Sequence, residues 1–237
     1  MTSSKAASSG NSSISGGSNA SSAAEPVKQI KTIPGGKMLT VQNIQQTPEL
    51  AAGCEVTAAS IILNYTGFPV SKCGLLKYLP QNNTFTTKGG VKYGPNPWTT
   101  FVGKPDTDRY GCYAPVIVKT INSYLSQLGN KKGDHMAADI SGAPIESLYE
   151  NIDNGTPVIV WVTIGMQEPV LSDSWFLSDT NQSFQWIQKE HCMVLIGYDS
   201  TKAYFCDPLS KDNVVSYNKD LFEERYREMF MQSVAMN

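Results

Sequence analysis

Apolar residues recur at helical spacing in four segments of the chain. The clearest segment is residues 55–65, where Val56, Ala59 and Leu63 share one face and Gly67 follows as a stop signal. This spacing predicts an α-helix that buries one side. The other three helices are expected at residues 71–79, 115–128 and 144–154.

The last third of the chain favours strands. Residues 158–164 are β-branched and apolar without alternation, which is typical of a strand buried on both faces. Residues 191–198 and 203–206 flank a polar turn, Asp199–Lys202, and predict a hairpin. A weak alternation predicts a short strand at residues 38–41. Because helices come first and strands follow, we expect an α+β fold.

Residues 81–115 are rich in Gly, Pro, Asn, Lys and aromatic side chains. We expect a long ordered loop region with a functional role, because Trp98, Phe101, Tyr110 and Tyr113 offer anchors for it.

Residues 1–26 consist almost entirely of Ser, Gly, Ala and Asn. Such a segment cannot bury enough apolar surface to offset its ordering entropy, which predicts a flexible linker. A cloning remnant is the alternative. We divide the chain into a disordered linker, residues 1–36, and one domain, residues 37–237. Linkers of this kind commonly tether exported domains, so we expect an extracellular or cell-envelope protein whose signal or anchor is absent from this sequence.

Composition narrows the possible functions. Charged residues are 17% of the chain and the formal net charge is -2, so we expect neither a nucleic-acid partner nor an anionic membrane surface. No apolar run reaches the roughly 18 residues that a membrane span needs. The five cysteines form no CxxC and the chain has two histidines, which disfavours a zinc site and thiol redox chemistry. Only His135 and His191 could serve as an imidazole base.

Cys54 lies between Gly53 and the first predicted helix. Unpaired N–H groups and the helix dipole at a helix start favour a thiolate, which is the nucleophilic form of cysteine. The alternative is a small buried cysteine in the first turn.

His191 opens a predicted strand, and Asp207 ends the next one, just before Pro208. The hairpin would bring this carboxylate near the imidazole, where it could fix the tautomer and stabilise the imidazolium. A core histidine and an ordinary Asp-Pro turn are the alternatives. A cysteine at a helix start, a histidine far downstream on a strand, and an acid 16 positions later (207 minus 191) form the chain order of papain-like enzymes.

The segments around these residues resemble the peptidase family-39-like cysteine peptidases, relatives of the bacteriocin-leader-processing peptidases that occur as exported domains in Gram-positive bacteria. The resemblance covers about residues 37–237. It rests on the strings at residues 46–57, 191–199 and 207–208, with support from residues 101–103 and 113–116.

The resemblance implies a papain-like cysteine proteinase fold, with an N-terminal helical part that carries the nucleophile and a C-terminal antiparallel sheet that carries His and Asp. It implies Cys54 as nucleophile, His191 as general base and then acid, and Asp207 as the residue that orients His191. It implies no metal and no organic cofactor, and a peptide or protein as the partner.

The resemblance also implies a glutamine upstream of the nucleophile that helps to hold the oxyanion. Gln46 is the candidate, although it lies eight positions before Cys54 where six is usual. Position 48 is proline and cannot serve, so the loop before Gly53 must absorb the extra length. Gln45 is the alternative, and a plain loop residue is the non-catalytic interpretation of Gln46.

Several other residues carry weaker expectations. Glu55 should point away or sideways from Cys54, either forming an ion interaction at the helix start or contacting substrate. Cys73 and Cys112 could pair in an exported protein, and the sequence leaves this open. Aromatic side chains that either line a cleft or anchor the core are Trp98, Trp175 and Trp186. Cys192 and Cys206 are expected as buried fillers, and His135 as an exposed loop residue.

Four functions fit these residues. The first is a cysteine peptidase that forms a thioester acyl-enzyme through Cys54, His191 and Asp207. A cell-wall amidase or transpeptidase would use the same chemistry. A catalytically silent binding or adhesion domain could keep the fold, and a biosynthetic acyltransferase is the fourth. Substrate specificity and oligomeric state are not encoded in any recognisable pattern.

Overall fold

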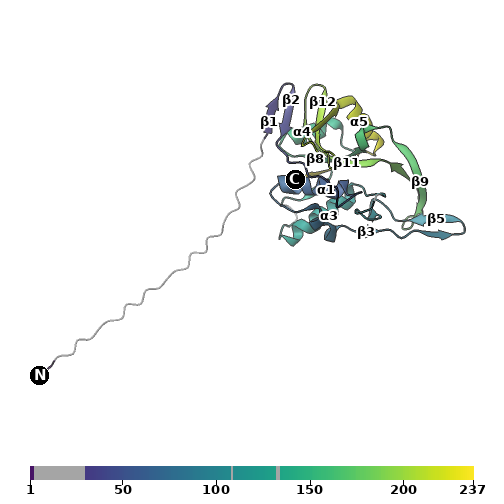
Figure 1. Cartoon of the computed structure of the whole chain (residues 1–237), viewed down its shortest axis with the longest axis horizontal. Coiled ribbons are helices and arrows are strands. Elements are labelled where there is room, and N and C mark those ends of the chain that lie inside the picture. Colours follow the sequence, from purple (N-terminus) through teal and green to yellow (C-terminus); the bar gives the residue numbers. More distant parts are fainter. Residues whose placement is uncertain (3–29, 108, 132–133) are drawn as a thin grey trace.

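The computed structural model describes residues 1–2, 30–107, 109–131 and 134–237. Its helices and mostly antiparallel sheets confirm the expected α+β class. In Figure 1 the sheet that contains β8 and β11 lies between α1 and α3 on one side and α4 and α5 on the other. The helices of the described part are α1 (Cys54–Tyr65), α2 (Lys72–Leu75), α3 (Ala114–Gln127), α4 (Ile145–Asp153) and α5 (Lys219–Glu228), with 3₁₀ turns η1 (Leu76–Tyr78) and η2 (Ile164–Met166).

The first, third and fourth predicted helices are confirmed within one residue at each end. The second is shorter than expected, because α2 passes directly into η1 before Pro80. Helix α5 was not expected, because it has a polar composition and follows the predicted strands. A local signal was nevertheless present: the side chain of Asn218 caps α5 by accepting hydrogen bonds from the backbone N–H groups of Asp220 and Leu221.

The main sheet supports the site. It runs in the order β1-β2-β11-β8-β14-β7, with β12 paired to β11 and β13 paired to β12. Its strands are β1 (Ile30–Ile33), β2 (Gly36–Leu39), β7 (Ala137–Asp139), β8 (Val158–Thr163), β11 (Glu190–Tyr198), β12 (Lys202–Cys206), β13 (Val215–Asn218) and β14 (Ser233–Met236).

The hairpin expected from the pattern is the β11–β12 pair, in which Val194 lies opposite Cys206. The predicted central strand is β8, whose six residues are all buried between β11 and β14. Helix α1 packs directly on β11 and β8. This packing brings the start of α1 against the start of β11, although the two are far apart in sequence.

Residues 81–115 are more regular than the predicted loop. They contain β3 (Gln81–Asn82), β4 (Thr86–Lys88), β5 (Val91–Gly94) and β6 (Phe101–Val102). Strands β4 and β5 join β9 (Val170–Leu177) and β10 (Ser183–Gln188) in a second sheet, which extends to one side of the molecule in Figure 1. The loop expectation failed because these strands have only two to four residues each and because β5 is held by pairing with the distant strand β9.

The linker assignment of residues 1–36 falls mostly on residues 3–29, which lie outside the described residues. Its last part is wrong, because β1 pairs antiparallel with β2 and so belongs to the main sheet. The folded part therefore includes Ile30, seven positions before the expected boundary at Lys37. Among the described residues no helix has both the length and the apolar character that crossing a bilayer requires.

Candidate active site

Cys54 is the first residue of α1, as the sequence predicted, and it is 5% exposed. The helix begins here because Gly53 allows the preceding loop to close on Leu50: a Cβ at position 53 would lie 2.4 Å from the Cβ of Leu50. Gly53 caps the helix without a side-chain acceptor. The thiol is therefore held at the N-terminal end of a buried helix.

His191 and Asp207 are brought together by the β11–β12 hairpin. Nε2 of His191 lies 2.7 Å from Oδ1 of Asp207, and the backbone N–H of Leu209 donates to the same oxygen at 2.8 Å. Burial acts to raise the pKa of Asp207, but the hydrogen bond and charge of His191 and the Leu209 N–H outweigh it, so this pKa is lowered. Because an ionised carboxylate can only accept, Nε2 carries the proton and Nδ1 is the nitrogen free to act as a base.

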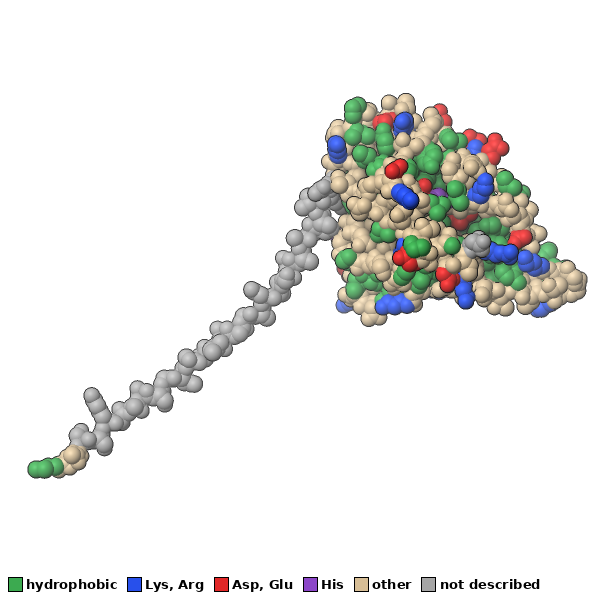
Figure 2. Space-filling view, viewed as in Figure 1, with side chains coloured by type: hydrophobic (Ala, Val, Ile, Leu, Met, Phe, Trp, Pro, Cys, Tyr) green, Lys and Arg blue, Asp and Glu red, His purple; other side chains and the backbone are tan. Residues whose placement is uncertain are grey.

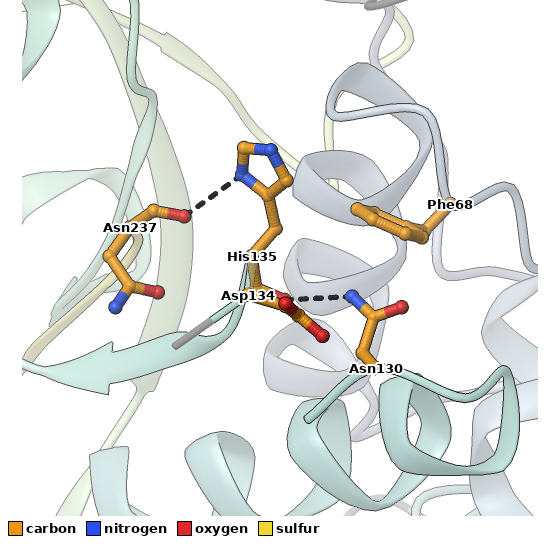
Figure 3. Close-up of a pocket in the computed structure, with 5 residues that line it drawn as sticks. All are labelled: Phe68, Asn130, Asp134, His135 and Asn237. Carbon is orange, nitrogen blue, oxygen red and sulfur yellow. Dashed lines mark hydrogen bonds between the residues drawn. The ribbon is translucent and has the colours of Figure 1, made fainter. Parts of the chain in front are cut away.

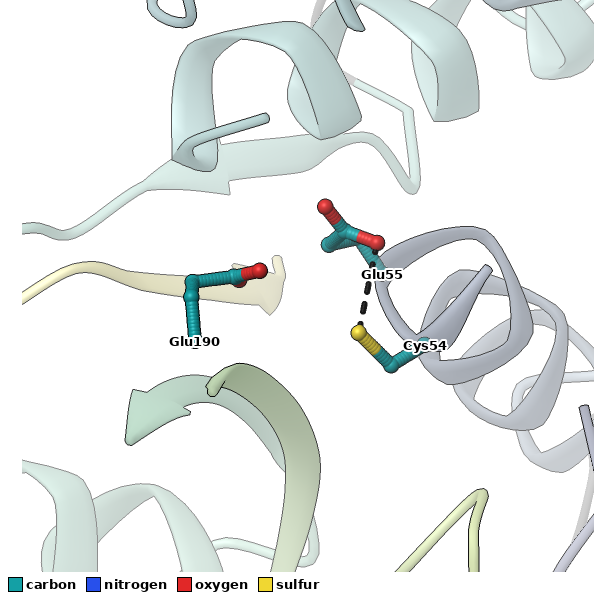
Figure 4. Close-up of side chains that lie close together, drawn as sticks. All are labelled: Cys54, Glu55 and Glu190. Atoms are coloured by element: carbon teal, nitrogen blue, oxygen red, sulfur yellow. Dashed lines mark hydrogen bonds between the residues drawn. The ribbon is translucent and has the colours of Figure 1, made fainter. Parts of the chain in front are cut away.

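The thiol of Cys54 faces Glu55 (Figure 4). Sγ donates to Oε2 of Glu55 at 3.3 Å, and the backbone N–H of Cys192, the residue after His191, also reaches the thiol. Across the described ranges no hydrogen bond joins Sγ to the His191 ring. The structure thus brings Cys54 next to the β11 segment that carries His191, with the thiol turned toward a carboxylate.

The helix start was expected to stabilise a thiolate at Cys54, but in this conformation other effects on the thiol pKa are larger. Burial raises the pKa of the Cys54 thiol well above its ordinary value, and the negative charges of Glu55 and Glu190 raise it further. The N–H of Cys192 acts in the opposite direction but does not compensate. Cys54 is therefore neutral while Sγ faces Glu55.

The expected orientation of Glu55 is also wrong. Its side chain points toward the Cys54 thiol and not away or sideways from it. Its side chain is fully buried, and Oε1 accepts the backbone N–H of Cys112 at 2.7 Å while Oε2 accepts the thiol. Burial raises the pKa of Glu55 to about 7. In this inward orientation the carboxylate exchanges hydrogen bonds with water for those from the Cys112 N–H and the Cys54 thiol.

Glu190, the first residue of β11, is a site residue that the sequence analysis missed. Burial and the charge of Glu55 raise its pKa well above the ordinary value for a glutamate. Its oxygen Oε1 is buried without a hydrogen-bond partner in the described structure. Its position next to His191 in sequence was the one available signal, and adjacent strand residues ordinarily face opposite sides.

Gly111 gives the two carboxylates their room. A Cβ at this position would lie 2.2 Å from Oε1 of Glu55 and 3.1 Å from Oε2 of Glu190. The next residue, Cys112, is fixed by its carbonyl, which accepts Nε1–H of Trp161 at 2.8 Å. The backbone of Gly111 and Cys112 therefore packs directly against the side chains of both glutamates.

Gln46 and Gln45 differ sharply in environment. Gln46 is 2% exposed, its Nε2 donates to the carbonyl of Ala51 at 2.8 Å, and its backbone N–H donates to the carbonyl of Pro208, next to Asp207. Gln45 is exposed. The loop between Gln46 and Gly53 absorbs its extra length in a turn. The Leu50 N–H closes this turn by donating to the Gln46 carbonyl. Of the two candidates, only Gln46 is packed beside the hairpin that carries Asp207.

The tryptophans serve mainly as anchors. Trp175 and Trp186 are buried and pack with Phe184, Tyr113 and the half-buried Trp98 in one aromatic cluster. The shortest ring separation in the cluster is 4.6 Å, between Trp98 and Tyr113. Of the two expectations for these side chains, the structure supports the core anchor for Trp175 and Trp186.

All five cysteines are free thiols, so Cys73 and Cys112 do not pair. Cys73 is exposed and Cys112 is buried. Cys192 and Cys206 are fully buried, as expected for fillers. Cys192 also contributes its backbone N–H to the Cys54 thiol, a role the sequence did not indicate.

His135 is exposed, as expected, and it lines a surface pocket of about 460 Å³ (Figure 3). Its Nδ1 lies 3.1 Å from the carbonyl oxygen of Asn237, and Asn130 donates to the His135 carbonyl. Phe68, on the pocket wall, follows the C-terminal end of α1. The pocket thus lies at the opposite end of the helix from Cys54.

Charge does not organise the visible surface. Figure 2 shows basic and acidic side chains interspersed on the face that it displays, without a patch of one sign that covers it. This agrees with the formal net charge of -2.

Comparisons with known proteins fit this geometry. The sequence model of the Peptidase_C39 like family matches residues 38–234. The chain is 27% identical over 220 residues to the uncharacterized protein YvpB of Bacillus subtilis (strain 168), covering 92% of this chain and 82% of that protein. It also matches a crystal structure from Bacillus anthracis, provisionally assigned as a C39-like peptidase, with a TM-score of 0.72 and 30% identity over 84% of this chain and 94% of that one.

Proposed function

Because the chain belongs to the Peptidase_C39 like family, we propose that it is a cysteine peptidase with Cys54 as nucleophile, His191 as general base and acid, and Asp207 as the residue that orients His191. The observation that carries the proposal is the 2.7 Å hydrogen bond between Asp207 and Nε2 of His191. This bond leaves Nδ1 of His191 as a proton acceptor. His191 lies on β11, and the N–H of the next residue, Cys192, contacts the Cys54 thiol.

The reaction begins with a change at the thiol. Sγ must turn from Glu55 to Nδ1 of His191, because the carboxylate holds the proton on sulfur and the imidazole can remove it. The resulting thiolate attacks a peptide carbonyl and is stabilised as an ion pair with the imidazolium. Asp207 supports the positive ring through Nε2.

The tetrahedral intermediate needs donors for its oxyanion. The backbone N–H of Cys54 is one donor, at the start of α1. Gln46 supplies the second, since its Nε2 carries two protons and the carbonyl of Ala51 takes one of them. His191 then protonates the leaving amine, and water hydrolyses the thioester with His191 as base.

Alkylation with iodoacetamide across a pH series, analysed by peptide mass spectrometry, tests the proposal. Cys73 is an internal control, because it is an exposed free thiol on the same chain. In the arrangement with Sγ turned to Nδ1 of His191, the imidazolium offsets the burial that keeps the thiol neutral beside Glu55. We therefore expect Cys54 to react faster than Cys73 well below the ordinary thiol pKa of about 8.5, and His191→Ala to abolish this advantage. If Cys54 reacts no faster than Cys73 at any pH, the site is not activated and a silent binding domain explains the fold better.

Turnover is tested with a mixed peptide library, using Cys54→Ala as the matched inactive control. We expect new peptide termini with the wild-type chain alone. Ligation of added amines in place of hydrolysis would indicate the transpeptidase variant of the same thiol chemistry.

A further inference from the structure

Three potential metal ligands meet at the start of α1. The Sγ of Cys54 and carboxylate oxygens of Glu55 and Glu190 all lie within 4.8 Å of one another. Figure 4 shows Cys54 and Glu55 at the start of α1, with the side chain of Glu190, the first residue of β11, pointing toward them. The proposed catalytic cycle uses only the first of these three groups, so the two carboxylates need a separate explanation.

The surrounding backbone is shaped for this cluster. Gly111 leaves space that a Cβ would fill, at 2.2 Å from Glu55 and 3.1 Å from Glu190. The Cys112 N–H orients Glu55 at 2.7 Å, and Trp161 in turn fixes the Cys112 carbonyl. Outer hydrogen bonds of this kind hold ligating carboxylates in place at metal sites.

The cluster also carries unsatisfied polar atoms. Oε1 of Glu190 is buried and has no hydrogen-bond partner among the described residues, although Glu190 as a whole is partly exposed. The hydroxyl of Tyr113, a fully buried side chain, likewise has no partner. Burial raises the pKa of Tyr113, and the charges of Glu190 and Glu55 raise it further because the phenol lies near both carboxylates.

The structure describes no basic side chain in an ion pair with either carboxylate, that of Glu55 or that of Glu190. A pair of buried carboxylates without a cation is costly, and it must either retain a proton or bind a positive ion. The unpartnered oxygen of Glu190 points to the second possibility.

We propose that Cys54, Glu55 and Glu190 bind one Zn²⁺ ion, and that this ion reversibly blocks the nucleophile. The binding site is independent of the activity, whereas the block rests on the proposed peptidase function. A tetrahedral zinc centre with ordinary Zn–S and Zn–O bonds separates its ligand atoms by roughly 3.5 Å. The observed separations allow this with small side-chain movements, and a fourth position stays open for water.

The ligand set selects the class of metal. Thiolate sulfur favours zinc and similar thiophilic ions, whereas Mg²⁺ and Ca²⁺ favour an all-oxygen shell. On binding, Sγ forms a bond to the metal as the Cys54 proton, and any proton that the two carboxylates hold, leave to solvent; no oxidation occurs. A thiolate held by zinc cannot attack a carbonyl, so removal of the ion restores the free cysteine.

Direct metal binding by the chelator-treated full chain tests the site without requiring turnover. ZnCl₂ titration is followed by calorimetry, and CoCl₂ titration by the absorption that a cobalt–thiolate bond produces. We expect one ion per chain, and about tenfold or greater loss of affinity in Cys54→Ser and in Glu190→Gln. Cys73→Ser and Glu150→Gln, which alter an exposed thiol and an exposed carboxylate, should bind as the wild type does.

Two results would overturn the site: absence of stoichiometric zinc binding by the wild type, or binding that survives both Cys54→Ser and Glu190→Gln. Near-native circular dichroism of the two variants establishes that each is folded before titration. Peptidase activity without zinc binding would remove this inference alone. Zinc binding at these residues without peptidase activity would instead remove the proposed function and leave the metal site.

Discussion

Asp207 accepts the Nε2–H of His191 at 2.7 Å, and this bond determines which ring nitrogen can serve as a base. The pKa of Asp207 is lowered, so the carboxylate stays ionised and holds the proton on Nε2. Nδ1 then remains as the acceptor that the proposed mechanism needs for the proton of Cys54. The role proposed for His191 thus depends on its hydrogen bond to Asp207.

Replacement Asp207→Asn should lower peptidase kcat by at least about tenfold, because the amide can donate to Nε2 and stabilise the wrong tautomer. Progress curves with a cleavable peptide measure this change. Asp212→Asn is a matched control in the same loop, since Asp212 is exposed. Equal kcat for the wild type and Asp207→Asn would contradict the orienting role.

Acid should destabilise the fold partly through Asp207. Its folded-state pKa lies below the unfolded value of about 3.9, so its contribution to stability is fully present above that pH. The contribution is lost as pH falls through the folded value. Urea unfolding at a series of pH values should therefore show a smaller acid-induced loss of stability in Asp207→Asn than in the wild type. Identical pH dependence in the two proteins would refute this linkage.

Glu55 should make the stability of the fold depend on pH in the opposite direction to Asp207. Burial raises its pKa to about 7, so the folded chain retains a proton that the unfolded chain loses above about pH 4.5. Stability should fall as pH rises from there to about 7, by roughly 1–3 kcal/mol. Unfolding curves of Glu55→Gln, which keeps an acceptor for the Cys112 N–H, should lack this loss. The variant should also alkylate at Cys54 at lower pH, because a negative charge beside the thiol is removed.

Gly111→Ala should destabilise the protein by about 1–3 kcal/mol, because the new methyl group overlaps Oε1 of Glu55. Thermal unfolding measures the loss. The double variant with Glu55→Asp, whose shorter side chain withdraws the carboxylate, provides the control. Gly111→Ala should lower stability less when Glu55→Asp is present. If the effects of the two substitutions simply add, the overlap with Glu55 is not the cause of the lost stability.

The two glutamines allow a paired test of the oxyanion donor. Gln46→Ala should lower kcat by about 10²-fold, because one donor to the developing negative charge is lost. Gln45→Ala should have little effect, since Gln45 is exposed. Steady-state kinetics on both variants decide between them. A loss of kcat in Gln45→Ala with none in Gln46→Ala would reverse the assignment.

The periodic elements were predictable because their cause is local. Helices α1, α3 and α4 and strands β8, β11 and β12 have apolar patterns that fix their type and approximate ends. Strands β4, β9 and β10 escaped prediction because the sheet they form depends on the β5–β9 pair, which joins segments far apart in the chain. The polar helix α5 escaped because its composition matched neither the apolar helix pattern nor the strands around it.

The sequence by itself determined the identities and chain order of Cys54, His191 and Asp207, and the hairpin that joins the last two. Tertiary structure alone decided the surroundings of the thiol. Glu55 and Glu190 lie 135 positions apart (190 minus 55), and they meet only because α1 packs on β11 and Gly111 leaves room for both. Burial then sets their protonation and that of Cys54, because the free energy of a charge depends on the solvent it has lost, and that loss exists only in the folded chain.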